Sequence, residues 1–102
     1  MKKILIITIC VIAAAQGLGF AADIDAARAK ATVCAACHGP KGVSMNPVWP
    51  SLAGQKDQYL ARQLKAFRDG NRKDPLMGPQ AAGLTDADMV NLSAYFSGLP
   101  CK

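Results

Sequence analysis

The chain has 102 residues, of which 51% are hydrophobic, and its formal net charge is +5. A chain of this length forms one small domain, which has difficulty burying enough apolar surface to fold without a disulfide, a metal or a cofactor. Without Lys2 and Lys3, ten basic and seven acidic residues remain, a net charge of +3. We expect no nucleic-acid partner.

Residues 1–21 have the pattern of a secretory signal peptide. Lys2 and Lys3 precede an apolar run over residues 4–15, and the small residues around Ala21 offer a cleavage site. The alternative is an uncleaved membrane anchor, but the apolar run is shorter than the ~20 residues that a span needs. We therefore expect export to the periplasm, cleavage after Ala21 and no stable membrane insertion afterwards. Residues 22–102 are the predicted mature domain.

The first predicted helix covers residues 25–33, which are rich in alanine, and Asp23 or Asp25 is placed to cap it. The second covers residues 56–69. Its apolar stripe recurs at helical spacing, and Gly70 ends it. The stripe consists of Tyr59, Leu60, Gln63, Leu64 and Phe67.

A third helix begins at Thr85, with Asp88 placed to complete a capping box, and Gly98 and Pro100 stop it. Residues 39–54 and 70–84, rich in glycine and proline, are predicted as loops. Loops of that length are uncommon in a compact domain. The sequence therefore predicts an all-α fold whose centre is filled by something other than protein.

The stretch "CAACH" at residues 34–38 is compatible with three chemistries. A redox dithiol expects a preceding strand, but an alanine-rich helix is predicted there. A zinc site needs four ligands, and His38, the only histidine, directly follows Cys37. Covalent haem attachment uses all three residues, since C-x-x-C-H is its motif. We predict one haem c, with thioethers to Cys34 and Cys37 and an iron–nitrogen bond to His38.

Three methionines of the mature chain are candidates for the second axial ligand of the iron. Met89 lies on the apolar stripe of the last helix and is expected in the core. Met45 is close to the attachment motif, in a loop rich in small residues. Met77 stands between prolines, in a loop stiff enough to hold its side chain, so it is the predicted ligand. A thioether ligand favours ferrous iron and raises the reduction potential.

With these residues the chain resembles the small monohaem class I c-type cytochromes of the c553 or c5 group, and one half of a dihaem cytochrome c4. The matching stretches cover nearly all of the mature chain: "VCAACHGPKG", "WPSLAGQKDQYLARQLKAFRDGNR" and "PLMGPQAAGLTDADMVNLSAYFSGL". The resemblance implies a cytochrome c fold, with three main helices and long loops around one covalently bound haem.

The resemblance also implies roles for residues around the haem. The carbonyl of Pro50 would accept a hydrogen bond from the free ring nitrogen of His38, and Leu52 would pack on the haem face. Tyr59 and Arg72, with Gln55, match positions near the haem edge or its propionates. Phe96 or Tyr95 would bring the last helix against the alanines of the first, Ala27 and Ala31.

The function implied is periplasmic electron transfer rather than enzyme catalysis. A quinol-oxidising complex or a dehydrogenase would be the donor, and a terminal oxidase or a reductase the acceptor. Two alternatives stay open: a dedicated haem subunit of one periplasmic dehydrogenase, and a haem enzyme or gas sensor with an open iron position. The basic residues of the second helix lie away from its apolar stripe and form either a docking patch or a solvated face; they are Lys56, Arg62, Lys65 and Arg68. Cys101 departs from the family pattern, and it permits a disulfide dimer.

Overall fold

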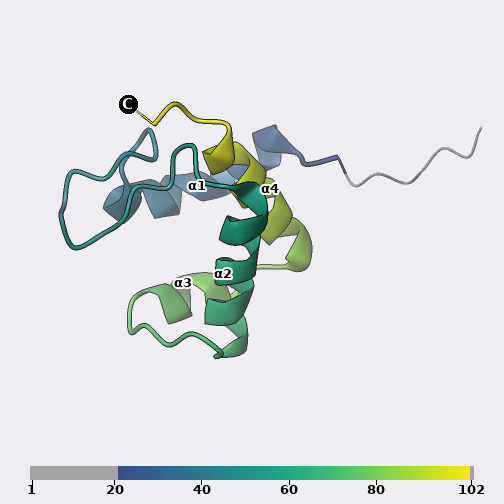
Figure 1. Cartoon of the computed structure of the whole chain (residues 1–102). Coiled ribbons are helices and arrows are strands. Elements are labelled where there is room, and N and C mark those ends of the chain that lie inside the picture. Colours follow the sequence, from purple (N-terminus) through teal and green to yellow (C-terminus); the bar gives the residue numbers. More distant parts are fainter. Residues whose placement is uncertain (1–20, 102) are drawn as a thin grey trace, which may run out of the picture.

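The computed structural model describes residues 21–101, which contain four helices and no strand. Figure 1 shows them in chain order: α1 (Ile24–His38), α2 (Asp57–Asp69), α3 (Met77–Ala82) and α4 (Asp86–Ser97). The predicted all-α class is therefore confirmed for this part of the chain. No helix within it is long and apolar enough to span a bilayer. The predicted signal peptide lies outside the described residues, apart from Ala21.

Helix α1 is longer than predicted. It begins as expected, because the side chain of Asp23 accepts a hydrogen bond of 3.0 Å from the backbone N–H of Ala26. It does not end at residue 33 but continues to His38, so the whole CAACH stretch is helical. Its alanines favour this continuation. Gly39 ends the helix at φ 91°, a conformation that side chains with a Cβ rarely adopt.

Helix α2 matches the prediction to within one residue and ends at Gly70, which is left-handed with φ 80°. Its apolar stripe is narrower than expected, since Leu60 is buried whereas Tyr59 is 46% exposed. Arg68, expected on the outer face, is instead partly buried. Its guanidinium pairs with Asp69 at 2.9 Å and with Asp86 at 2.6 Å, so it ties α2 to the start of α4.

The six-residue helix α3 was not predicted, since residues 70–84 were expected to be loop throughout. Gly78 and Pro79 are poor helix formers, so local propensity gives no signal for it. The helix is instead stabilised by tertiary contacts, because α3 packs on α2 and Ala81 is fully buried. Met77 is therefore the first residue of a helix and not part of a loop.

Helix α4 has the predicted capping box. The hydroxyl of Thr85 accepts a hydrogen bond of 3.0 Å from the backbone N–H of Asp88, and the Asp88 carboxylate accepts one of 2.9 Å from the backbone N–H of Thr85. The same carboxylate pairs with Lys30 of α1 at 2.7 Å. Asp88 therefore both caps α4 and joins it to α1.

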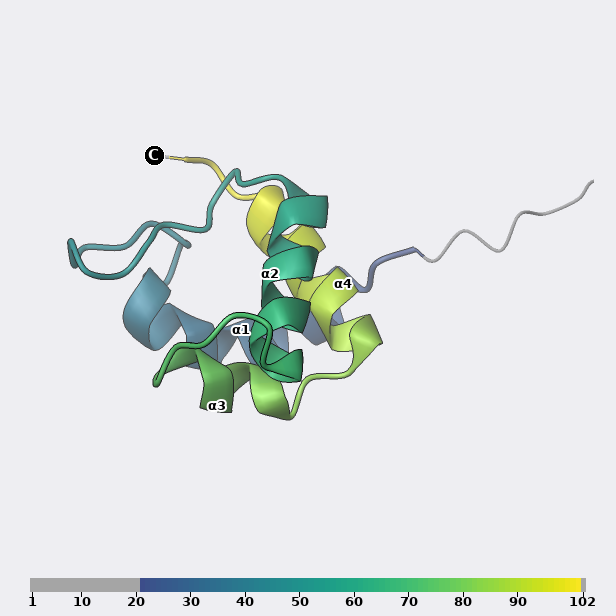
Figure 2. The ribbon, with the colours of Figure 1, turned by 60° about the horizontal axis from the view of Figure 1, so that its bottom comes forward.

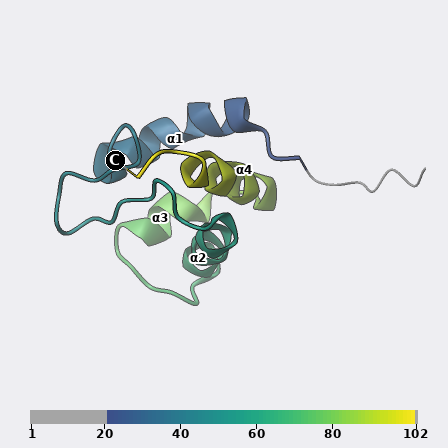
Figure 3. The same ribbon diagram turned by 45° about the horizontal axis from the view of Figure 1, so that its top comes forward.

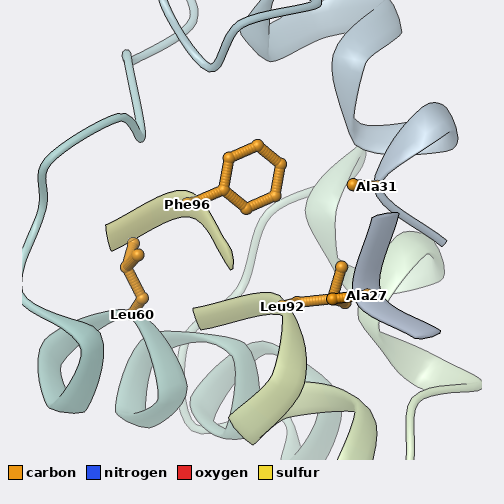
Figure 4. Packing of buried hydrophobic residues seen from close by; sticks show 5 residues of the cluster. All are labelled: Ala27, Ala31, Leu60, Leu92 and Phe96. Atoms are coloured by element: carbon orange, nitrogen blue, oxygen red, sulfur yellow. The ribbon is translucent and has the colours of Figure 1, made fainter. Parts of the chain in front are cut away.

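The core lies where α4 packs against α1 and α2. Figure 4 shows Phe96 and Leu92 of α4 between Leu60 of α2 and the two alanines of α1, Ala27 and Ala31. Phe96 thus makes the predicted contact with α1, and Tyr95 packs edge-on against its ring. Met89 is buried, as expected for a core residue. This core is small, and two of its five residues are alanines.

The connection after α1 and helix α3 lie on the same side of the molecule as the end of α1 that carries CAACH (Figures 2 and 3). In Figures 2 and 3, three segments lie on one side of α2 and α4. They are the connection from Gly39 to α2, helix α3 and the C-terminal end of α1. The helical core therefore leaves the attachment motif and Met77 on one side of the molecule.

Candidate haem-binding site

His38 is buried at the end of α1, with 7% of its surface exposed, and its Nδ1 lies 2.7 Å from the carbonyl oxygen of Pro50. A carbonyl oxygen accepts hydrogen bonds and cannot donate them, so Nδ1 carries the proton. The other ring nitrogen, Nε2, then has a lone pair available for a metal. The predicted hydrogen bond between these two residues is therefore present, and it selects the tautomer that can bind iron.

The connection that carries Pro50 is closed at its ends like an Ω-loop. The carbonyl of Gly42 accepts hydrogen bonds from the backbone N–H groups of Leu52, at 2.8 Å, and Ala53, at 3.0 Å. The φ of Gly42 is 71°, a conformation that side chains with a Cβ rarely adopt. A Cβ there would also lie only 3.1 Å from the ring of Phe96, so this position requires glycine. Residues 39–54 form a loop, as predicted, and these local hydrogen bonds hold its ends together.

The two motif cysteines lie one helical turn apart on α1, and no disulfide joins them. Cys34 is partly buried against the core cluster, and this burial raises the pKa of its thiol. Cys37 is exposed. The zinc interpretation needs four ligands, and residues 21–101 contain no group of even three His, Cys, Asp or Glu side chains that could hold a metal ion.

Met77, the predicted second ligand, is partly buried at the start of α3. The other two methionines of the described chain differ from it, because Met45 is 95% exposed and Met89 is buried in the core. The Asp74 carboxylate accepts hydrogen bonds from the backbone N–H groups of Met77, at 2.8 Å, and Leu76, at 2.9 Å. These two bonds hold the pKa of the Asp74 carboxyl below its usual range.

Sequence reasoning missed Asp74 as a residue of this site. The available signal was its place directly before Pro75, since an Asp-Pro pair favours the start of a turn. Because residues 70–84 were expected to be loop, no helix start was sought there.

The residues expected around a haem differ in what they contact. Leu52 packs against the same core cluster as Cys34. Tyr59 and Arg72 are exposed. The guanidinium of Arg72 donates a hydrogen bond of 2.7 Å to Gln63 and lies 4.5 Å from the centre of the Phe67 ring. The side chain of Gln55 accepts a bond from the neighbouring Lys56 backbone. Of the five expected residues, only Pro50 makes a hydrogen bond with His38 in the described part of the chain.

The residues present fit a haem group. Each of the two connections carries an exposed apolar side chain: Val48 is 79% exposed and Leu76 57%. An apolar group that covered them would remove this surface from water, which is favourable. The donor set is also suitable, since it comprises two thiols, an imidazole with a free nitrogen and a thioether. An all-α fold with these donors defines a c-type cytochrome domain.

Comparisons with known proteins also indicate a cytochrome c domain. The family model for cytochrome c matches residues 25–100. The chain is 44% identical over 80 residues to cytochrome c-554(548) of Halomonas halodenitrificans, covering 76% of this chain and 96% of that protein. It is 44% identical over 72 residues to the thiosulfate dehydrogenase electron acceptor of Stutzerimonas stutzeri, covering 68% of this chain and 33% of that protein.

A solved structure, reduced recombinant cytochrome c4 from Pseudomonas stutzeri, superposes with a TM-score of 0.74 at 37% identity, covering 78% of this chain and 47% of that one. The chain spans nearly all of one relative but half or less of many others. It belongs to the cytochrome c family, whose members are electron carriers rather than enzymes. His38 and Met77 occupy the positions of the haem axial ligands, and the Cys34–Cys37–His38 motif indicates one covalent haem c.

Proposed function

We propose that the mature protein is a periplasmic monohaem electron carrier. Cys34 and Cys37 hold the haem by thioether bonds, and His38 and Met77 bind its iron. When bound, the haem supplies a one-electron couple between ferrous and ferric iron. Because protein side chains fill both axial positions, neither is free for oxygen or a substrate.

The observation that carries this proposal is the hydrogen bond from His38 Nδ1 to the carbonyl of Pro50. It orients the imidazole and leaves the other ring nitrogen free to bind the iron that a haem would supply. Burial of the ring on the closed loop keeps that orientation fixed. Leu52 and Cys34 pack against the same core cluster. We propose that Leu52, Tyr59 and Arg72 lie around the bound haem.

An optical spectrum of the exported protein tests the proposal. We expect sharp c-type bands after reduction and, before it, the weak far-red band of methionine bound to ferric iron. Met77→Ala should abolish the far-red band, whereas Met45→Ala, which changes an exposed methionine near the motif, should keep it. Rapid carbon monoxide binding by the reduced wild type would instead indicate an open-site sensor or enzyme. Absence of haem bands, in a host that attaches haem, would refute the proposal.

Export is tested separately. We propose that residues 1–21 are a signal peptide and that the mature chain begins at Ala22. Mass spectrometry of the protein recovered from the periplasm should give an N-terminal peptide that starts at this residue. A full-length chain retained in the membrane fraction would contradict both the cleavage and the proposed compartment.

We propose that the partners are redox proteins that dock briefly, as weak electron-transfer complexes do. A donor of quinol-oxidising or dehydrogenase type and an acceptor of oxidase or reductase type fit a carrier with both axial positions filled. The relative that is named an electron acceptor of thiosulfate dehydrogenase supports a dehydrogenase as one donor.

The same relative favours a second candidate function, in which this domain is the dedicated haem subunit of one dehydrogenase. The two candidates predict different behaviour on purification. A dedicated subunit co-purifies with its enzyme in a fixed ratio through size-exclusion chromatography, whereas a diffusible carrier elutes alone at the size of its own chain.

Cys101 is an exposed free thiol whose sulfur contacts Gly54. Exposed thiols seldom stay reduced in an oxidising compartment, so we propose that Cys101 links two copies by a disulfide in the purified protein. Non-reducing gels should show a dimer band that reducing agent and Cys101→Ser both remove. An identical monomer band under the two conditions would contradict the dimer.

A further inference from the structure

The segment before Met77 is organised by one residue, Asp74. Its carboxylate accepts the hydrogen bonds from the backbone N–H groups of Leu76 and Met77, at 2.9 and 2.8 Å. Its backbone carbonyl accepts a third, of 3.0 Å, from the backbone N–H of Gly78. Asp74 therefore holds three consecutive backbone N–H groups, and the middle one belongs to Met77.

Helix α3 needs this support at its first turn. It has only six residues, and isolated helices of that length are unstable in water. Leu76, which immediately precedes it, provides no side-chain cap. Asp74 supplies the missing acceptor from two residues further back. Pro75 between them has no N–H group and a restricted φ, so it stiffens the turn without competing for the carboxylate.

The two ends of α3 are held in different ways. Packing holds the far end, since Ala81 is fully buried, whereas the hydrogen bonds to Asp74 hold the first turn, which carries Met77. A methionine side chain has three rotatable bonds and adapts easily to its surroundings. The position of its sulfur therefore depends on how firmly the Met77 backbone is held.

We propose that Asp74 is a positioning residue for the axial ligand Met77. This rests on the proposed function, in which Met77 binds the iron. Asp74 does not touch the iron or the reacting electron. It keeps the first turn of α3 formed, so that the thioether competes successfully with other ligands for the metal. Without it, the Met77 backbone moves more freely and the methionine is displaced more readily.

The test is displacement of Met77 by imidazole in the oxidised holoprotein. Loss of the far-red band measures how much methionine has been displaced. Removing a capping side chain changes a local equilibrium by about five- to thirty-fold. We therefore expect Asp74→Ala to bind imidazole about five- to thirty-fold more tightly than the wild type. Asp57→Ala is the matched control, because Asp57 is also exposed and accepts a backbone bond, but at the start of α2.

Two conservative variants separate cap geometry from charge. Asp74→Asn keeps an acceptor oxygen at the same place and should bind imidazole like the wild type. Asp74→Glu keeps the charge but moves the carboxylate one methylene further out, so it should behave like Asp74→Ala. The comparison of Asn with Glu also tests the proposal if the alanine variant folds poorly.

Either of two results would overturn the proposal. If all the variants bind imidazole like the wild type, Asp74 does not position the ligand. If Glu resembles the wild type while Asn resembles Ala, the effect is one of charge on the iron and not of the cap. A wild type without any far-red band would instead refute methionine ligation itself, which is a failure of the proposed function.

Discussion

His38 and Pro50 are twelve residues apart in sequence, yet Nδ1 of the first donates a hydrogen bond of 2.7 Å to the carbonyl oxygen of the second. Such a bond raises the basicity of an imidazole ligand, which favours ferric over ferrous iron. The hydrogen bond therefore opposes the effect of the Met77 thioether on the reduction potential.

Pro50→Ala should weaken this bond by giving the loop backbone more freedom. We expect the reduction potential to rise by tens of mV, given that a tenfold change in a one-electron equilibrium corresponds to about 59 mV. Potentiometric titration measures the reduction potential of each variant. Pro47→Ala, in the same exposed loop, is the control. An equal rise in both variants would show that the loop, and not the His38 hydrogen bond, sets the potential.

The pairing of Asp88 with Lys30 predicts a dependence of stability on pH. The Lys30 ammonium and the backbone N–H of Thr85 hold the pKa of the Asp88 carboxyl below its usual range. The unfolded chain therefore binds this proton more readily than the folded chain. The resulting stabilisation is present above the unfolded pKa, near 4, and is lost as pH falls through the folded value.

Urea midpoints measured from about pH 6 down to pH 3 test this dependence. Asp88→Asn should flatten the curve at its acid end relative to the wild type. Asp25→Asn, which changes an exposed carboxyl paired only with Arg28, is the control. Identical slopes in the wild type and Asp88→Asn would show that Asp88 does not contribute to acid sensitivity.

Thr85 anchors α4 through its hydroxyl, so Thr85→Ala should lower the free energy of unfolding by about 1 kcal/mol. Thr85→Ser keeps an acceptor oxygen and should recover most of that loss. Denaturant unfolding followed by circular dichroism measures both. A serine variant as unstable as the alanine variant would mean that the methyl group of Thr85, and not its hydroxyl, stabilises the helix.

Ser93 lies in the middle of α4, and its buried hydroxyl has no hydrogen-bond partner among the described residues. Burying an unpaired hydroxyl is costly, and alanine is the better helix former. Ser93→Ala should therefore raise the free energy of unfolding by up to about 1 kcal/mol. Ser97→Ala, in the last turn of the same helix, should change it less. A clear loss of stability in Ser93→Ala would reveal a partner for the hydroxyl.

Much of the fold could be predicted from local patterns. The start of α1 at Asp23, the end of α2 at Gly70 and the capping box of Thr85 and Asp88 all depend on residues close together in sequence. The C-x-x-C-H motif is equally local, because its three functional residues lie within five positions. For these features the physical cause and the sequence signal occur in the same short segment.

Tertiary structure decided the rest. Helix α3 forms against local propensity, because Ala81 is buried by packing and Asp74 supplies a cap two residues before the helix. Arg68 is drawn from the expected outer face to Asp86, eighteen residues away. The tautomer of His38 depends on a carbonyl that reaches it only when Gly42 closes the loop. The sequence by itself determined which atoms bind haem. How firmly His38 and Met77 are held depends on contacts between distant segments, which no local pattern encodes.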